Sequence, residues 1–173
     1  MWYCTNMRYC YFDSPLGNLL LGGTVEHLCL ISFPIGKMSR RPEPDWQLDA
    51  NNFISVKQQL SEFFAGYRQH FDLSYLLTGT SFQQLVLRSV AKIPYGTTCS
   101  YSAIGEQINN PKAVRAIGLA NGANPLPIII PCHRVIGKNG SLSGFGGGLP
   151  AKKFLLDLEA SGYITYNLCH GWD

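Results

Sequence analysis

The sequence predicts an α+β protein with two domains: an N-terminal α/β domain with a small antiparallel sheet over residues 1–80, and a mostly helical domain over residues 81–173. Short apolar runs separated by turn residues dominate the first part, which is typical of antiparallel strands. Helical spacing and capping residues dominate the second part. With 173 residues, of which 46% are hydrophobic and 14% charged, the chain can fold around one core or two small ones, and the composition argues against disorder.

Three strands are expected at the start of the N-terminal domain. Residues 9–12, 19–22 and 27–33 are short apolar runs, and the turn-forming segment 13–18 (DSPLGN) separates the first two. Residues 34–44 contain prolines, a glycine and a pair of arginines, which predicts a surface loop.

A helix is expected to complete the N-terminal domain. Ile54, Leu60, Phe63 and Phe64 fall near helical spacing, and Gly66 should end that helix. The expected role of this domain is support for the rest of the chain, and the sequence predicts no chemistry for it.

The C-terminal domain is expected to begin with an amphipathic helix after a boundary at residues 76–80. Ser81 and Gln84 form an S-x-x-Q capping box at the start of that helix, and residues 94–96 (PYG) end it. Residues 100–108 predict a second, short helix.

A third helix follows closely and suggests a helix-turn-helix. Asn110 is its candidate N-cap, Pro111 occupies the first turn, and residues 112–119 continue the helix. Two short helices across a tight turn are typical of this motif. The second of them is rich in small residues, which either pack closely against the core or let the backbone approach DNA. For Val114 and Ile117 we favour packing in the core.

The residues that could carry chemistry lie in the segment 131–135 (PCHRV). The apolar run 128–130 is consistent with a buried strand that delivers Cys132 to a pocket wall. A thiol reacts as its thiolate, so a base is needed at neutral pH, and His133 could supply it. Glu159, on a helix predicted to begin near Pro150, is the candidate carboxylate that would orient this base. We therefore expect a pKa of Cys132 below that of a free thiol. Neighbours on an extended chain point to opposite sides, so contact between thiol and imidazole should run through a turn or a bridging water.

Each of these residues also has an ordinary structural interpretation. A cysteine beside a histidine is common by chance, and Cys132 alone would more often be an inert core thiol. Tyr101 could cover a core, Asn124 could be a turn residue, and Arg115 could be a solvated helix charge. Arg134 is expected to be structural, because a guanidinium can tie several carbonyls together below the site.

Several separately spaced motifs, in order along the chain, resemble the O6-alkylguanine-DNA alkyltransferase family (methylated-DNA–protein-cysteine methyltransferases). The resemblance is strong from about Ser81 to Glu159 and weaker at residues 13–17 (DSPLG). It implies a ribonuclease-H-like N-terminal domain and a C-terminal DNA-binding domain with the helix-turn-helix. The motifs that carry it are residues 93–101 (IPYGTTCSY), 110–118 (NPKAVRAIG), 124–125 (NP), 131–135 (PCHRV) and 146–149 (GGGL).

The resemblance implies a role for each matching residue in the chemistry. Cys132 resembles the alkyl acceptor, with His133 as its water-linked base and Glu159 as the orienting carboxylate. Tyr101 matches the tyrosine that crowds the phosphate of the flipped nucleotide and donates a hydrogen bond to the base. Asn124 matches the asparagine that links the recognition helix to the active-site strand.

The resemblance also implies a DNA-binding surface and a substrate pocket. Arg115 matches the arginine that fills the stack vacated by the flipped guanine, in a helix that enters the minor groove. Phe145 stands where the family usually carries tyrosine, so an aromatic wall is expected without its hydroxyl. The remaining residues expected at the DNA surface are Lys112, Ala113 and Ala116. Those expected to line the substrate pocket with Asn124 and Phe145 are Pro131, Gly146 and Gly147.

The activity implied is DNA repair by direct, stoichiometric and irreversible transfer of an alkyl group from O6-alkylguanine in double-stranded DNA to Cys132. The preference between O6-alkylguanine and O4-alkylthymine is left open. Guanine O6 lies inside the base stack, so the transfer requires base flipping. The product is a thioether, which offers no good leaving group, so the protein should act once, as a suicide enzyme. Neither a metal nor an organic cofactor is required, and a monomer is expected.

The spacing of the cysteines bears on both disulfides and zinc binding. The six cysteines show no C-x-x-C spacing, which favours reduced thiols. Some family members hold a structural zinc in the N-terminal domain. The residues that could be imagined as ligands here do not reproduce that pattern, so we expect no zinc; they are Cys4, Cys10, Cys29, His27 and His70.

Charge and hydropathy bear on partners and location. Residues 1–80 carry six Lys and Arg against seven Asp and Glu, whereas residues 81–173 carry eight against four. This basic excess is a mild indication of a polyanionic partner for the C-terminal domain. No apolar run approaches the ~20 residues of a membrane span, and residues 1–12 do not resemble a secretory signal. The expected location is therefore the cytoplasm, or the nucleus in a eukaryote.

Two other classes of protein, a cysteine hydrolase and a non-catalytic DNA-binding protein, would use some of the same residues. A cysteine hydrolase would share the Cys–His–carboxylate logic, but it would turn over and leaves the helix-turn-helix unexplained. A non-catalytic binder of alkylated DNA resembles family relatives that lack the acceptor cysteine. The presence of Cys132 disfavours the second.

Overall fold

The computed structural model describes residues 6–161. Its N-terminal part is a four-stranded sheet in which β1 (Arg8–Ser14), β2 (Gly17–Gly23) and β3 (Leu28–Ser32) run antiparallel. A short strand, β4 (Gln47–Leu48), pairs in parallel with β1, so the order across the sheet is β3-β2-β1-β4. The three longer strands confirm the predicted runs. The sequence did not indicate β4, because two exposed residues show no apolar alternation.

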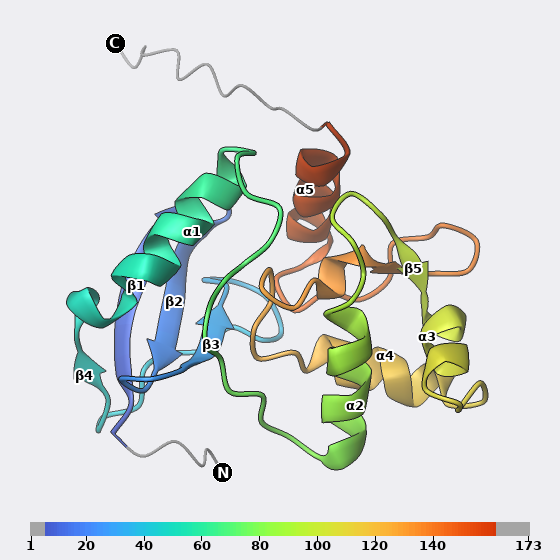
Figure 1. Cartoon of the computed structure of the whole chain (residues 1–173), viewed down its shortest axis with the longest axis horizontal. Helices are drawn as coiled ribbons and strands as arrows, with labels where there is room; N and C mark the ends of the chain where they lie inside the picture. Colours follow the sequence, from blue (N-terminus) through green and yellow to red (C-terminus); the bar gives the residue numbers. More distant parts are fainter. Residues whose placement is uncertain (1–5, 162–173) are drawn as a thin grey trace.

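One helix packs on this sheet, as predicted. The helix α1 (Ile54–Phe64) follows a 3-10 turn, Ala50–Phe53, whose start is capped by the carboxylate of Asp49. The rings of Phe12 and Phe64 stack 6.4 Å apart, between the sheet and α1. Figure 1 shows α1 lying along the sheet, with its C-terminal end next to α5 (Leu149–Ala160), where the rings of Phe64 and Phe154 lie 6.5 Å apart.

The C-terminal part is mostly helical, which confirms the predicted fold class. A two-stranded parallel sheet, β5 (Cys99–Ser100) with β6 (Val135–Ile136), joins its two halves. Its helices, up to residue 161, are α2 (Ser81–Val90), α3 (Tyr101–Gln107), α4 (Val114–Gly122) and α5 (Leu149–Ala160). In Figure 1, α2, α3 and α4 lie together on the side opposite α1. No helix within residues 6–161 is long and apolar enough to cross a membrane.

The predicted capping box of α2 was wrong by one residue. The N-cap is Thr80, whose hydroxyl accepts a hydrogen bond from the backbone N–H of Gln83, and the Gln83 side chain accepts from the backbone of Thr80. Ser81 is therefore the first helical residue. Both pairings satisfy the capping-box pattern in the sequence, and only the backbone geometry decides between them.

The predicted start of α4 was also wrong. Asn109 adopts a left-handed backbone (φ 55°) after α3, and the N–H of Ala113 donates to the carbonyl of Asn110 in a turn. This turn includes Pro111, and the helix begins only at Val114, without a side-chain cap. Asn110 is thus part of the turn between α3 and α4 rather than the cap of α4.

The predicted strand at residues 128–130 is a buried turn. The side chain of Asn124 accepts a hydrogen bond from the N–H of Leu126 and donates one to the carbonyl of Ile130. A further bond joins Ile130 N–H to the Leu126 carbonyl, at 2.8 Å. Ile128 has φ 77°, a left-handed conformation that is costly for a β-branched residue. A short apolar run shows burial, but its period cannot distinguish a strand from such a turn.

Candidate active site

Cys132 is held in a rigid turn directly after this buried segment. The 3-10 turn Cys132–Arg134 begins after Pro131, whose carbonyl accepts a hydrogen bond from the N–H of Arg134. The Asn121 side chain donates to the carbonyl of Cys132 at 3.2 Å, so α4 fixes the turn from one side. The thiol is free, and the residue is only 3% exposed. Cys132 and His133 thus follow one another in a tight turn.

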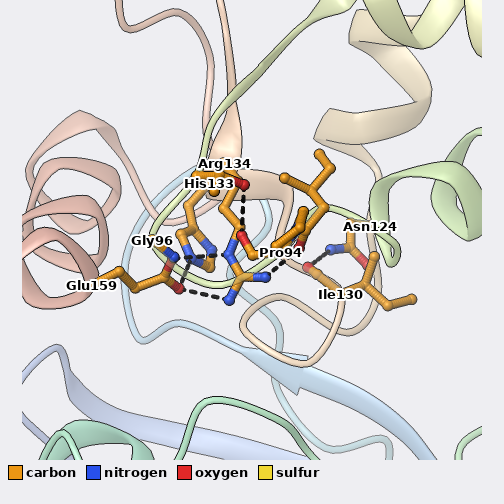
Figure 2. Close-up of polar contacts among 9 residues, drawn as sticks. Pro94, Gly96, Asn124, Ile130, His133, Arg134 and Glu159 are labelled. Atoms are coloured by element: carbon orange, nitrogen blue, oxygen red, sulfur yellow. Dashed lines mark hydrogen bonds and ion pairs between the residues drawn. The ribbon is translucent and has the colours of Figure 1, made fainter. Parts of the chain in front are cut away.

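A buried carboxylate lies at the centre of the polar contacts around this turn (Figure 2). Glu159 Oε1 lies 2.7 Å from His133 Nε2, and Oε2 accepts a hydrogen bond from the N–H of Gly96 at 3.1 Å. Arg134 donates to both oxygens, with distances of 2.8 and 2.9 Å, and also to the carbonyl of Ile93. The structure therefore brings Glu159 and His133 together as predicted. Arg134 binds one carbonyl and this carboxylate, whereas several carbonyls were expected.

These contacts determine the charges of the carboxylate and the imidazole. Burial acts to raise the pKa of Glu159, but the hydrogen bonds from His133 and Arg134 outweigh it and lower that pKa to about 2. Burial lowers the pKa of His133, so the imidazole is neutral at neutral pH. A neutral imidazole that donates from Nε2 to Glu159 keeps a lone pair on Nδ1. Nδ1 is buried and has no hydrogen-bond partner within residues 6–161.

The thiol is less acidic than the sequence led us to expect. Burial raises the pKa of Cys132 to about 11, although a hydrogen bond with Asn124 and the charge of Lys152 act in the opposite direction. The expectation of a pKa below that of a free thiol was wrong for the DNA-free protein. The desolvation of the sulfur outweighs its polar neighbours, because no cation contacts it directly enough to stabilise the thiolate. Cys132 therefore requires a base to react at neutral pH.

Lys152 is a buried cation next to this site, and the sequence analysis missed it. Its ammonium donates to the carbonyls of Val135 and Ser143, at 2.6 and 2.8 Å, and its side chain is fully buried. Burial lowers its pKa. The two carbonyls lie at the ends of the loop that follows Cys132, so Lys152 holds this loop closed. The sequence did contain a signal for this burial. Lys152 lies three residues before Leu155 and seven before Glu159, and this helical spacing places it on the buried face of α5.

A cavity of about 600 Å³ lies between α4 and this loop. Tyr101, Arg115 and Phe145 line it, as do Val114 and Gly118. Val114 is 40% exposed, so its predicted place in the core was wrong, whereas Ile117 is fully buried as predicted.

The other residues predicted to contact DNA lie beside this cavity. Lys112 and Ala116 are exposed, and Ala113 is half-buried at the start of α4. The Ser143 hydroxyl is 3.5 Å from the Tyr101 hydroxyl, which places Tyr101 opposite the closed loop.

A second, much smaller cavity of about 30 Å³ reaches Cys132 itself. Asn124 and Phe145 line it, and Gly146 lines both cavities. Gly147 instead packs on the ring of Phe33, where a Cβ would come within 2.6 Å of the ring. Pro131 is buried but lines neither cavity, so of the predicted pocket residues only Asn124, Phe145 and Gly146 line a cavity.

The structure brings no metal-binding group together within residues 6–161, since no three His, Cys, Asp or Glu side chains form a cluster there. Cys4, one of the zinc ligands considered, lies outside these residues.

Two family models together match almost all of the residues that the structure describes. Residues 7–76 match the family model for the ribonuclease-like domain of 6-O-methylguanine DNA methyltransferase, and residues 81–161 match the model for its DNA-binding domain. The chain belongs to this family.

Similar proteins span nearly the whole chain. A methylated-DNA–protein-cysteine methyltransferase from Methanosarcina acetivorans is 45% identical over 155 residues, covering 90% of this chain and 99% of the relative. One from Mycobacterium tuberculosis is 44% identical, covering 90% and 93%.

Two solved structures agree with this fold in detail. The Mycobacterium tuberculosis O6-methylguanine methyltransferase superimposes with a TM-score of 0.84 at 43% identity, covering 92% of this chain and 96% of that one. The structure of Mycobacterium tuberculosis OGT in complex with DNA gives the same TM-score at 42% identity, covering 93% and 96%.

Proposed function

We propose that this protein repairs DNA by moving an alkyl group from the O6 of guanine in double-stranded DNA onto its own Cys132. The observation that carries the proposal is the position of Cys132: it is buried beside the His133–Glu159 pair and adjoins a small cavity that shares a wall with a much larger one. The membership of the chain in the 6-O-methylguanine DNA methyltransferase family supports it.

The alkylated base must leave the duplex before it can react. Guanine O6 lies in the stack, where a buried thiol cannot reach its alkyl carbon. The cavity of about 600 Å³ is large enough for an extruded guanine, and Tyr101 and Arg115 lie at its wall. Arg115 would occupy the vacated stack, and Tyr101 would press on the rotated nucleotide. These contacts would offset an extrusion cost of a few kcal/mol.

The transfer is an in-line displacement at the alkyl carbon. The thiol proton of Cys132 moves through one bridging water to Nδ1 of His133, and Glu159 stabilises the resulting imidazolium. The S–C bond forms as the C–O6 bond breaks, and the electron pair of the broken bond stays on the guanine. The Tyr101 hydroxyl donates a proton to a ring nitrogen of the departing base. The products are a thioether on Cys132 and an unmodified guanine, so each molecule reacts once.

Binding to DNA rests on α4 and on the charge of the C-terminal domain. Small residues at its start let the helix backbone approach the minor groove, and Lys112 adds a charge for a phosphate. No base-specific contact is required, because the search is for damage rather than for a sequence. The protein acts as a monomer, without a cofactor, in the compartment that holds the DNA.

Intact-protein mass spectrometry tests this function. After incubation with excess duplex containing O6-methylguanine, the protein should gain the mass of one methyl group, located on the peptide that contains Cys132. Cys132→Ser should gain none, because a hydroxyl is far too weakly acidic for one imidazole to activate it comparably. Repair of many equivalents by each protein molecule would instead indicate a hydrolase, and binding without any mass gain would indicate a non-catalytic reader of damage.

A further inference from the structure

A loop of the N-terminal domain enters the site described above. This loop, residues 34–41, follows β3 and places Met38 in the wall of both cavities, the small one at Cys132 and the larger one at α4. The sequence predicted only a surface loop here. The side chain of Met38 is half-buried, unlike its exposed neighbours Lys37 and Ser39.

The position of this loop is fixed by contacts on both sides. The Met38 N–H donates to the carbonyl of Gly146 at 3.3 Å, and the buried Ser32 hydroxyl donates to the carbonyl of Met38 at 3.2 Å. Gly36 lies so close to Gly146 of the C-terminal domain that a Cβ would come 2.2 Å from the Gly146 oxygen. With φ 107°, Gly36 also has a backbone conformation that other residues rarely adopt. Met38 is therefore held against Gly146.

Met38 and Gly146 form part of the partition between the two cavities. Five residues line both cavities: Met38, Gly122, Ala123, Phe145 and Gly146. A Cβ on Gly146 would lie 3.0 Å from both Cβ and Cγ of Met38, so no space remains between the two residues. A flipped base in the larger cavity must present its alkyl carbon to Cys132 past this partition. The space at Cys132 is only about 30 Å³, against about 600 Å³ for the larger cavity. A methyl group fits such a space, whereas a benzyl group requires the partition to move.

We propose that Met38 sets the size limit for the alkyl group that Cys132 accepts. This inference rests on the proposed function and gives the N-terminal domain a direct part in substrate selection. Methionine suits the position because its unbranched side chain changes rotamer readily. Larger alkyl groups are then transferred more slowly, because the free energy needed to displace this side chain adds to the barrier for transfer.

The experiment compares transfer from O6-methylguanine and O6-benzylguanine placed in the same duplex. Met38→Ala should raise the ratio of the benzyl rate to the methyl rate by about 10-fold to 100-fold, the range that a change in pocket size produces. Met38→Val, which shortens the side chain less, should give an intermediate ratio and serves if the alanine variant does not fold. Ile35→Ala is the matched control: Ile35 is on the same loop, is 73% exposed, and should leave the ratio unchanged.

If the ratio of the benzyl rate to the methyl rate stays at the parent value in both Met38 variants while methyl transfer is intact, Met38 does not set the size limit. That result would leave the proposed function standing. A parent protein that takes no methyl group from O6-methylguanine would overturn the proposed function itself. Gly146→Ala provides an independent check, because its added methyl would collide with Met38. The loss it causes in benzyl transfer should be largely restored by combining it with Met38→Ala, and the absence of any such rescue would also contradict the proposed partition.

Discussion

Cys132 and His133 are both buried, and for each of them burial favours the neutral form. The pKa of the thiol is raised to about 11 and that of the imidazole is lowered, so the resting site holds a thiol and a neutral base. An ion pair forms only as the thiol proton moves. Glu159 is ionised, and it stabilises the imidazolium as that charge develops. The reactivity of the Cys132 thiol therefore depends on Glu159, although this carboxylate contacts His133 and not the thiol itself.

Glu159→Gln should slow transfer from free O6-benzylguanine at neutral pH by about 100-fold, within the range expected for the loss of a general base. The neutral amide stabilises an imidazolium less than a carboxylate does, so His133 becomes a weaker base. In the parent, the rate should rise as His133 loses its proton below pH 6.5 and then stay flat through neutral pH. The free base is used because binding to a polyanion has its own dependence on salt and pH.

The two rate profiles should converge near pH 11, where Cys132 ionises without help from a base. This convergence separates a chemical role from a structural one, because damage to the fold would slow the reaction at every pH. The unfolding free energy is measured in parallel, since the variant leaves Arg134 without its buried partner. Coincident profiles at equal stability would mean that Glu159 only pairs with Arg134 and leaves the thiol alone.

The sequence predicted the side chains that carry the chemistry better than those that hold them in place. Cys132, His133 and Glu159 belong to residue types that are informative on their own. Lys152 and Met38 are not, because their roles depend on groups that meet only in the folded chain. Lys152 binds the two ends of one loop, and Met38 reaches the site from another domain.

At the scale of single elements, the helices were predicted well and the turns between them poorly. The boundaries of α1 and α3 follow from apolar spacing and from ordinary stop and cap residues. The turn at residues 124–130 does not, because its left-handed Ile128 is imposed by two hydrogen bonds of the Asn124 side chain. No local preference predicts a β-branched residue in that conformation. This turn is also the element that positions Cys132.

Arg115→Ala should slow repair of O6-benzylguanine in duplex DNA much more than reaction with the free base, since the free base needs no extrusion. Arg115 is exposed on α4 at the rim of the larger cavity, where it can reach the stack. If it offsets only ~1.4 kcal/mol of the extrusion cost, the rate in duplex falls about 10-fold. Both rates are measured by single-turnover kinetics at one salt concentration.

Lys112→Ala is the matched control, because it removes an exposed charge from the turn just before the same helix. It should weaken binding to damaged and undamaged duplex alike. The salt dependence of the binding constant should fall by the amount expected for the loss of about one phosphate contact. Equal losses of Arg115→Ala on duplex and on free base would show that Arg115 has only a structural role.

At the scale of the whole molecule, the active site lies where the two parts of the chain share one core. Aromatic contacts join them, with ring centroids 5.4 Å apart for Phe33 and Phe145 and 6.2 Å apart for Phe63 and Tyr95. Arg134 in turn lies 5.6 Å from the centre of the Tyr95 ring. The expected supporting role of the N-terminal domain is therefore too narrow, because its packing positions the wall of the cavity at Cys132. From the sequence, the contacts within each part could be predicted from periodicity, but the contacts between the parts could not.

The buried charges predict how stability depends on pH. Both His133 and Glu159 have a lowered pKa in the folded protein, so their contributions are fully present above pH 6.5 and are lost as the pH falls. As the pH falls, the contribution of His133 to the free energy of unfolding is lost first, because the buried imidazole is stable only in its neutral form. For Glu159, a decrease from 4.5 to about 2 corresponds to about 3 kcal/mol, which is lost between about pH 5 and pH 2. Urea unfolding at a series of pH values should therefore show a free energy that is constant near neutrality and falls steeply in acid.

The control for this dependence is Asp157→Asn, on the same helix as Glu159. Asp157 forms an exposed ion pair with Lys153, with side chains 59% and 67% exposed, and such pairs contribute little to stability. This variant should therefore follow the parent curve throughout. Glu159→Gln should flatten the part of the curve below about pH 5, because its amide takes up no proton there. An acid limb of equal depth in Glu159→Gln and in the parent would assign the lost stability to other carboxylates, and the buried pair would then have no measurable part in the stability of the fold.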